Sequence, residues 1–142
     1  MSFWDGTPRL DGVQGLVVEG VPHVREIVVD ALEACGAFVT AVDSAVKALA
    51  IVKRDRPGVL VSSLSTHDRD GYWLIRQIRS LPPDEGGDIP AATFTGRTTR
   101  EDRLNALRAG FQFHVPKPAD LRNLAGVVAL LSLRREAPVL VY

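Results

Sequence analysis

Several features that define other protein classes are missing from this chain. It has one cysteine, Cys35, so neither an intrachain disulfide nor a multi-cysteine zinc site can form. No apolar run approaches the roughly 20 residues needed to span a bilayer, and residues 1–12 lack the basic region and apolar run of a secretory signal. Seventeen basic and seventeen acidic residues give a formal net charge of zero. We therefore expect a cytoplasmic protein that binds neither nucleic acid nor membranes directly.

A glycine-rich phosphate loop is also missing. The first apolar run is followed by Glu19-Gly20-Val21-Pro22, which is neither a dinucleotide fingerprint nor a flavin phosphate loop. This sequence predicts no bound organic cofactor.

What the chain does have is a regular alternation of strand and helix signals. Short apolar runs predict five strands, at residues 15–18, 38–42, 59–62, 90–94 and 113–115. Helical periodicity follows each of them, with Asp43 or Ser44 and Asp70 as caps. Thr98 and Glu101 have capping-box spacing, and Leu104 and Leu107 supply the apolar side of that helix. The pattern predicts an α/β protein with a five-stranded parallel sheet covered by five helices.

One domain accounts for most of the 142 residues. Residues 1–12 read as an irregular leader, because Asp-Gly pairs and Pro8 interrupt any period. We place the domain at 13–133 and a C-terminal tail at 134–142. The end of this tail, APVLVY, is apolar and could form a short extra strand at a sheet edge.

The stretch from Pro57 to Gly71 carries most of the chemistry. Its strand runs into a loop rich in hydroxyl and acidic side chains, namely Ser62, Ser63, Ser65, Thr66, His67, Asp68 and Asp70. In an open parallel sheet, loops at the carboxyl ends of the strands form the crevice that binds ligands. Ser63 and its neighbours are therefore expected at the functional site.

Six segments in order resemble the receiver domain of bacterial two-component response regulators, such as the chemotaxis regulators, over about residues 13–132. They are LVVEG, RPGVLVS, DGYWLIRQIR, IPAATFTG, ALRAGF and HVPKP. The resemblance implies a doubly wound, flavodoxin-like fold with strand order 2-1-3-4-5. It also implies a role in signal transduction.

Working receivers of this family phosphorylate an aspartate at the end of the third strand. An acid pair after the first strand holds magnesium, while a lysine and a hydroxyl residue contact the phosphoryl group. The resemblance places the lysine at Lys117, the hydroxyl at Thr95 and the aromatic switch at His114. The acid pair is reduced to Glu19 and Gly20.

The acceptor position holds Ser63, which is the largest departure from the family pattern. A serine hydroxyl is a poor nucleophile without a base and a poor magnesium ligand. We therefore expect a pseudo-receiver that is not an enzyme, with weak or absent magnesium binding and no catalytic residue. Lys117 is expected to form a half-buried ion pair with Glu19 alone.

Alternatives remain at this stage. A working phosphotransfer regulator could use Asp68, Asp70 or Ser63 as a substitute acceptor, and the chain could be the receiver piece of a larger hybrid kinase. A hydrolase built from Ser63, His67, Asp68 and Asp70 is disfavoured, because no nucleophile elbow surrounds the serine. A metal site from His67, Asp68 and Asp70 is disfavoured too; a solvated loop with Asp70 as a helix cap fits these residues better.

The expected partner is another signalling protein or a second copy of the chain. Arginines around the fourth helix alternate with Glu101 and Asp102, a pattern typical of a solvated face. In receivers, however, the fourth helix, fifth strand and fifth helix form the usual partner face. The candidate partner residues are Arg97, Arg100, Arg103, His114 and Arg122.

Overall fold

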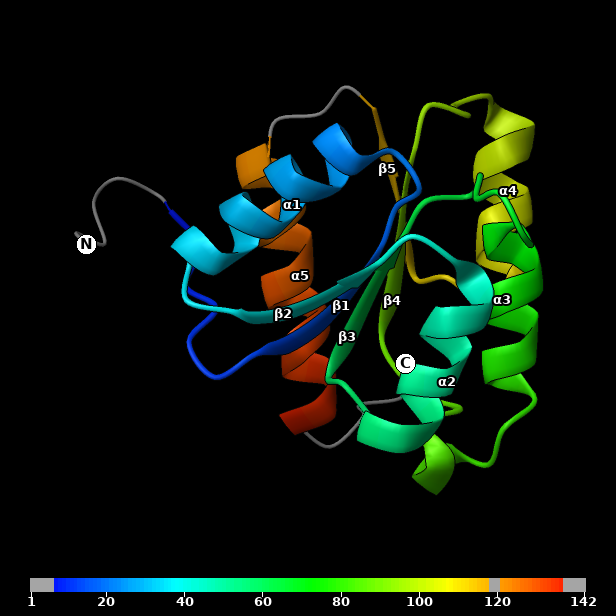
Figure 1. Cartoon of the computed structure of the whole chain (residues 1–142), viewed down its shortest axis with the longest axis horizontal. Coiled ribbons are helices and arrows are strands. Elements are labelled where there is room, and N and C mark those ends of the chain that lie inside the picture. The colour runs from blue at the N-terminus through cyan, green and yellow to red at the C-terminus, as the bar shows by residue number, and fades with distance from the viewer. Residues whose placement is uncertain (1–6, 118–120, 137–142) are drawn as a thin grey trace.

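The computed structural model contains a central parallel sheet with helices on both faces (Figure 1). It describes residues 7–117 and 121–136. The elements, in chain order, are β1 (Gln14–Val18), α1 (Pro22–Ala34), β2 (Phe38–Val42), α2 (Ala45–Asp55), β3 (Val59–Ser62), α3 (Gly71–Arg79), the short 3-10 helix η2 (Pro83–Glu85), β4 (Ala91–Thr95), α4 (Arg100–Ala109), β5 (Phe113–Pro116) and α5 (Leu121–Glu136).

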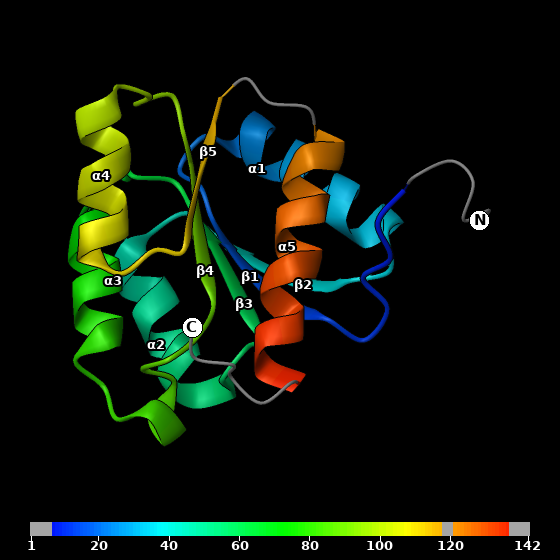
Figure 2. The ribbon, with the colours of Figure 1, turned by 180° about the vertical axis from the view of Figure 1, so that it is seen from behind.

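The strand order is β2-β1-β3-β4-β5, and every pairing is parallel. This confirms the predicted doubly wound fold. Helices α1 and α5 cover one face of the sheet, while α2, α3 and α4 cover the other, as the view from behind also shows (Figures 1 and 2). Because all strands are parallel, their carboxyl ends meet at one edge, where β5 ends in Figure 1.

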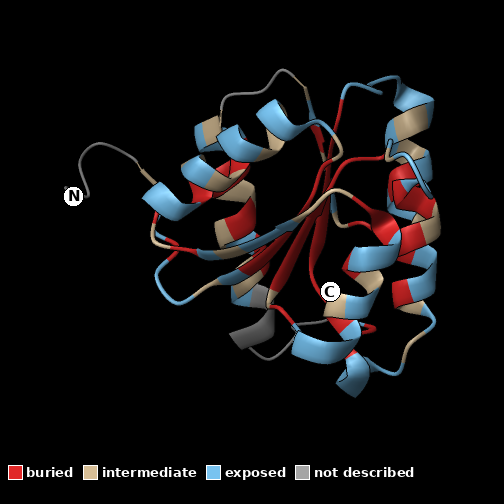
Figure 3. Ribbon diagram, in the orientation of Figure 1, coloured by how far each residue is buried: buried red, intermediate tan, exposed pale blue. Residues whose placement is uncertain are grey.

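Two apolar clusters hold the layers together, one on each face of the sheet. The strands β1, β3 and β4 are buried almost throughout, whereas the outer sides of the helices are exposed (Figure 3). Leu10 is fully buried in the cluster under α1 and α5, and its amide donates to the Cys35 carbonyl at 2.8 Å. The second half of the predicted leader therefore packs on the domain.

Most predicted element boundaries agree with the structure, but the α4 assignment is shifted. The capping box is formed by Thr99 and Asp102, one residue later than predicted. The helix buries Ala106, while Leu107 is 43% exposed. Thr98 and Thr99 are adjacent, so the sequence does not decide which of them is the N-cap of α4. The burial of Ala106 fixes the rotation of the helix.

Among the described residues, no helix is long and apolar enough to cross a membrane. The helix α5 extends to Glu136, so it enters the predicted tail region. The APVLVY segment, for which an extra strand is predicted, lies outside the described residues, as does Trp4.

Candidate functional site

Ser63, which the sequence predicts at the acceptor position, lies directly after β3. Its amide donates to the Val18 carbonyl at 2.8 Å, which extends the β1–β3 pairing by one bond. The residue is only 5% exposed. Its hydroxyl accepts from the Ser65 amide at 3.2 Å and donates to the Ser65 carbonyl at 3.3 Å. The hydroxyl is thus held by its own loop, and no basic side chain of the described chain hydrogen-bonds to it.

Glu19 and Lys117 form the ion pair that the sequence predicts. The ammonium of Lys117 donates to Glu19 Oε1, while Oε2 accepts from the Val21 amide at 3.1 Å. The Glu19 side chain is 4% exposed and the Lys117 side chain 24%. The ammonium also lies 5.3 Å from the centre of the Phe94 ring. Both charges of the pocket are therefore already compensated within the protein.

Gly20, the second acid position, leaves room for a side chain. A Cβ built there would meet only the Asp43 carbonyl oxygen, at 3.8 Å. Since 3.8 Å is an ordinary van der Waals distance, the backbone leaves room for a Cβ at this position.

Thr95 completes the site at the end of β4. It is 3% exposed, its hydroxyl accepts from the Arg97 amide at 3.1 Å, and its carbonyl accepts from the Lys117 amide at 2.7 Å. The β4–β5 pairing thus places Thr95 beside Lys117. The ends of four adjacent parallel strands bring Glu19, Ser63, Thr95 and Lys117 to one edge of the sheet, as predicted.

Asp68 has a structural role that the sequence did not reveal. Its carboxylate accepts from the Ser44 hydroxyl at 2.7 Å and from the Ala45 and Val46 amides at 3.1 and 3.0 Å, so it caps the N-terminus of α2. Burial raises the pKa of Asp68, but the hydrogen bonds from Ser44 and from backbone amides outweigh it and hold that pKa well below its usual value. The view of Asp68 as part of a merely solvated loop is therefore wrong, although the residue is exposed.

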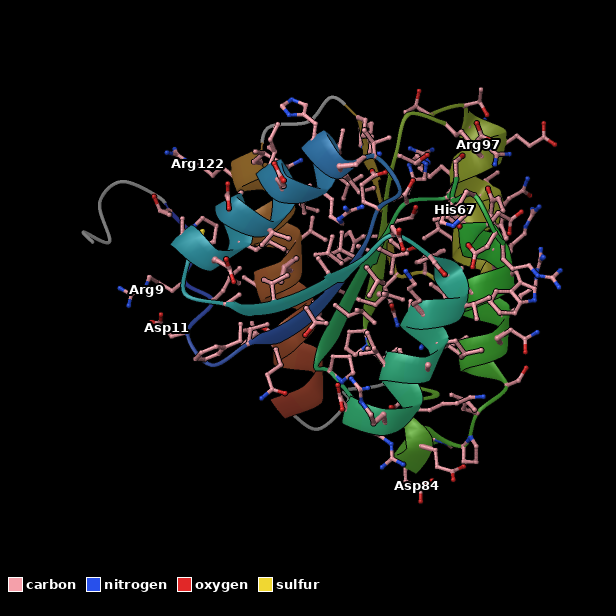
Figure 4. All side chains as sticks on the ribbon, viewed as in Figure 1. Arg9, Asp11, His67, Asp84, Arg97 and Arg122 are labelled. Atoms are coloured by element: carbon pink, nitrogen blue, oxygen red, sulfur yellow. The ribbon has the colours of Figure 1, made fainter. Side chains whose placement is uncertain are left out.

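Asp70 is the N-cap of α3, as predicted. Its carboxylate accepts from the Trp73 amide at 2.8 Å. Asp68 and Asp70 thus face different helices, and His67 is exposed on the loop (Figure 4). Among the described contacts, neither His67 nor the two aspartates hydrogen-bond to Ser63, so the disfavoured hydrolase set is not assembled around it.

The donor set at this edge of the sheet does not fit a magnesium ion. Glu19 is paired with Lys117, Asp68 and Asp70 cap helices, and Ser63 offers only a neutral hydroxyl. In the part of the chain that the structure describes, no three His, Cys, Asp or Glu side chains gather in a way that could hold a metal.

His114, at the switch position of β5, is connected to α4 and α3. Its Nε2 lies 2.8 Å from the Arg97 carbonyl. The Arg97 guanidinium lies 5.6 Å from the centre of the Tyr72 ring and 3.9 Å from Asp102. The Tyr72 hydroxyl donates to the Asp102 carbonyl at 3.4 Å. Sequence reasoning missed Tyr72; its only signal was a hydroxyl at an otherwise apolar helical position.

The candidate partner residues come from α4 and the loop before it, from β5 and from α5. Arg100 and Arg103 are exposed on α4, and Arg97 precedes that helix. Arg122 belongs to α5 and lies on the α1 side of the molecule, far from Arg97 (Figure 4). The helices α4 and α5 cover opposite faces of the sheet on either side of the edge strand β5, and the partner face proposed from these residues stays a prediction.

Comparisons with known proteins agree with this architecture. The family model described as "Response regulator receiver domain" matches residues 16–129. An uncharacterized 14.6 kDa protein of Leptolyngbya boryana is 38% identical over 113 residues, which are 80% of this chain and 85% of that protein. The response regulator MprA of Mycobacterium leprae is 35% identical over 123 residues, 87% of this chain and 52% of the relative. The chain thus spans about half the length of this MprA relative.

Solved structures agree in fold. The receiver domain of the Francisella response regulator 1452 has a TM-score of 0.80 at 18% identity, covering 87% of this chain and 99% of that one. The receiver domain of the sensor histidine kinase PA1611 from Pseudomonas aeruginosa has a TM-score of 0.78 at 26% identity, covering 85% and 98%. That structure holds a magnesium ion in its active-site cleft. With the family model matching most of its length, this chain belongs to the response regulator receiver domain family.

Proposed function

We propose that this receiver domain acts in two-component signalling as a phosphorylation-independent protein–protein interaction module and not as an enzyme. The observation that carries the proposal is how Ser63 and Lys117 are bonded in the pocket. The acceptor position holds a serine whose hydroxyl is bound within its own loop, and the lysine that would contact a phosphoryl group is paired with Glu19.

The first argument for the proposal is that Ser63 lacks a base that could activate its hydroxyl. A serine hydroxyl attacks a phosphoryl donor only when a base removes its proton. The nearest candidate in the loop, His67, makes no hydrogen bond to Ser63 among the described contacts, and Ser63 hydrogen-bonds to Ser65 instead. Phosphoryl transfer to Ser63 is therefore disfavoured.

The second argument is that this edge of the sheet has too few free carboxylates to bind magnesium. The PA1611 receiver binds magnesium in its cleft, but the corresponding edge of this chain supplies one carboxylate, which is already neutralised by Lys117. Magnesium prefers several oxygen ligands with near-octahedral geometry. We expect magnesium binding to be weak or absent.

Substitute acceptors are the main alternative, because a receiver that still transfers phosphate would use Asp68 or Asp70. Each of these carboxylates accepts amide hydrogen bonds at a helix N-terminus. Both oxygens of Asp68 accept such a bond, so phosphorylation there would consume one acceptor and weaken the cap. At Asp70 only Oδ1 accepts the Trp73 amide. A second alternative, the receiver piece of a hybrid kinase, is compatible with the module proposed here, because it concerns only what the domain is attached to.

The proposed interaction surface is the end of β5 with the start of α4. Arg97, Arg100 and Arg103 are exposed there, and His114 is half-buried and bound to the Arg97 carbonyl. In a phosphorylated receiver this switch side chain responds to the acceptor. Here the proposed role is a fixed surface that recognises another signalling protein or a second copy.

The decisive experiment is intact-mass spectrometry after incubation with acetyl phosphate and magnesium. We expect no phosphoryl adduct on the wild-type protein. The control is the double variant Ser63→Asp/Gly20→Asp, which restores both missing acids and is compatible with the space at Gly20. An adduct on the double variant alone supports the proposal.

A stoichiometric adduct on the wild-type protein would refute it. Hydroxylamine lability would then separate an aspartyl phosphate on Asp68 or Asp70 from a stable phosphoserine at Ser63. Loss of the adduct in Asp70→Asn or Asp68→Asn would identify the substitute acceptor.

The interaction itself is tested by affinity purification from the source cells, followed by reconstitution with the purified partner. Arg100→Glu should weaken that binary interaction, whereas the matched reversal Lys53→Glu on α2 should not, since both side chains are exposed. Sedimentation of the protein alone distinguishes a second copy from a different partner. Equal binding by both variants would exclude the α4 surface.

A further inference from the structure

A groove separates α3 from α4, on the face of the sheet opposite to α1 and α5. The two helices lie side by side in both views (Figures 1 and 2). The groove has a volume of about 330 Å³ and is lined by Tyr72, Arg76, Asn105, Arg108 and Ala109. Its position does not coincide with the acceptor pocket, since none of its lining residues belongs to the loops after β1, β3 or β5.

The lining carries positive charge without a compensating carboxylate. Arg76 comes from α3 and Arg108 from α4, and no acidic residue lines the groove. The exposed Arg54, by comparison, forms an ion pair with Asp55. Within the described chain neither groove arginine does; Arg76 contacts the Tyr72 ring at 5.7 Å, and its guanidinium hydrogens are not used in hydrogen bonds. Each guanidinium thus keeps its planar set of N–H donors for a ligand.

The side of the groove formed by Tyr72 is held in place. This residue is 9% exposed, and its ring lies between helices α3 and α4, with its hydroxyl donating to the Asp102 carbonyl. Burial raises the pKa of Tyr72, so its hydroxyl stays protonated and adds no negative charge to the groove. Asn105 adds an amide that can both donate and accept hydrogen bonds.

We propose that this groove is a binding site for a small phosphate monoester, with the phosphate between Arg76 and Arg108. Two guanidiniums match the charge of a phosphate dianion and bind it through paired N–H donors. A bare phosphate would fill only part of the groove, whose volume is at the lower end of that of small-molecule sites. The ligand therefore carries an organic part of about nucleotide size, with Asn105 placed to hydrogen-bond a polar ring edge.

The test is titration of the isotopically labelled protein with AMP, adenosine and inorganic phosphate, followed by amide chemical shifts. We expect saturable shifts at the groove with AMP, at a dissociation constant below about 1 mM, weaker binding of inorganic phosphate, and none of adenosine. Arg76→Gln and Arg108→Gln each remove one of the two charge-assisted contacts to the phosphate. Each variant should raise the dissociation constant for AMP by about tenfold or more.

Arg103→Gln is the matched control, because Arg103 is exposed on the same helix but does not line the groove. It should bind AMP like the wild type. Equal weakening by all three variants would show only general charge attraction and would overturn the site. So would shifts outside the groove, binding of adenosine as strong as that of AMP, equal binding of AMP and inorganic phosphate, or no saturable binding.

Discussion

Removal of the Lys117 ammonium tests the pocket most directly. In Lys117→Met the apolar stem can still contact Phe94, but the Glu19 carboxylate stays 4% exposed and, among the described residues, would accept a hydrogen bond only from the Val21 amide. Breaking a buried ion pair by removing one partner costs about 3–5 kcal/mol. Because Lys117 is 24% exposed and water reaches the site, we expect a smaller loss, about 2–3 kcal/mol in the free energy of unfolding.

The assay is urea unfolding followed by circular dichroism, with the slope m compared between variants. Lys47→Met is the matched control, since its ammonium pairs with Asp43 at 3.0 Å on the surface, with side chains 64% and 40% exposed. Such a solvent-exposed pair should contribute little to stability, so Lys47→Met should unfold close to the wild type. The m values should agree among all variants.

The double variant Lys117→Met/Glu19→Gln separates the pair from its individual side chains. If the loss in Lys117→Met arises from an uncompensated carboxylate, neutralising Glu19 should recover about 1 kcal/mol or more of it. Additive losses, or a Lys117→Met loss no larger than that of Lys47→Met, would refute the reasoning.

Three further changes test other contacts. Asp68→Ala should cost about 1 kcal/mol, because the Ala45 and Val46 amides at the start of α2 lose their carboxylate acceptor, while Ser44 still accepts from the Lys47 amide. The folded-state pKa of Asp68 is lowered, so this contribution is present above about pH 4 and is lost as the pH falls further. Urea unfolding of the variant should therefore show a weaker acid dependence than that of the wild type. Arg79→Met should lower the free energy of unfolding by about 2 kcal/mol. The Arg79 guanidinium donates to the Gly110 carbonyl at 3.0 and 2.8 Å and to the Gly87 carbonyl at 2.9 Å, and the variant loses these bonds. A thermal midpoint equal to that of the wild type would contradict this prediction. Thr93→Val should stabilise the protein by about 0.5–1 kcal/mol, because the buried Thr93 hydroxyl has no hydrogen-bond partner among the described residues. A loss of stability in chemical denaturation would show that the hydroxyl is hydrogen-bonded in solution.

The fold was predictable because its signals are local. Apolar runs and caps such as Ser44 and Asp70 mark the elements within a few residues, and the alternation of strand and helix leaves few topologies. Parallel strands then bring residues such as Glu19 and Lys117 to one edge, which made their pairing predictable although 98 positions separate them.

The contacts that were missed depend on side chains meeting across loops. Asp68 caps a helix that begins 23 positions earlier, and no local pattern marks an aspartate for a distant cap. The shift of the α4 capping box has a different cause, since both threonines satisfy the local rule and only tertiary packing decides between them.

Charge balance links the missing acids to the geometry of the pocket. Glu19 and Lys117 sum to zero, so the pocket is neutral without a bound cation. Restoring carboxylates at Ser63 and Gly20 would leave a net charge of minus two around one lysine, and like charges at close range destabilise the folded state unless a cation binds. The double variant Ser63→Asp/Gly20→Asp should therefore unfold at a lower temperature than the wild type without magnesium and gain stability when magnesium is added. The wild-type midpoint should not respond to magnesium, because its only pocket carboxylate is already neutralised; a magnesium-dependent rise in the wild-type midpoint would show that the Glu19–Lys117 pair opens to admit the ion.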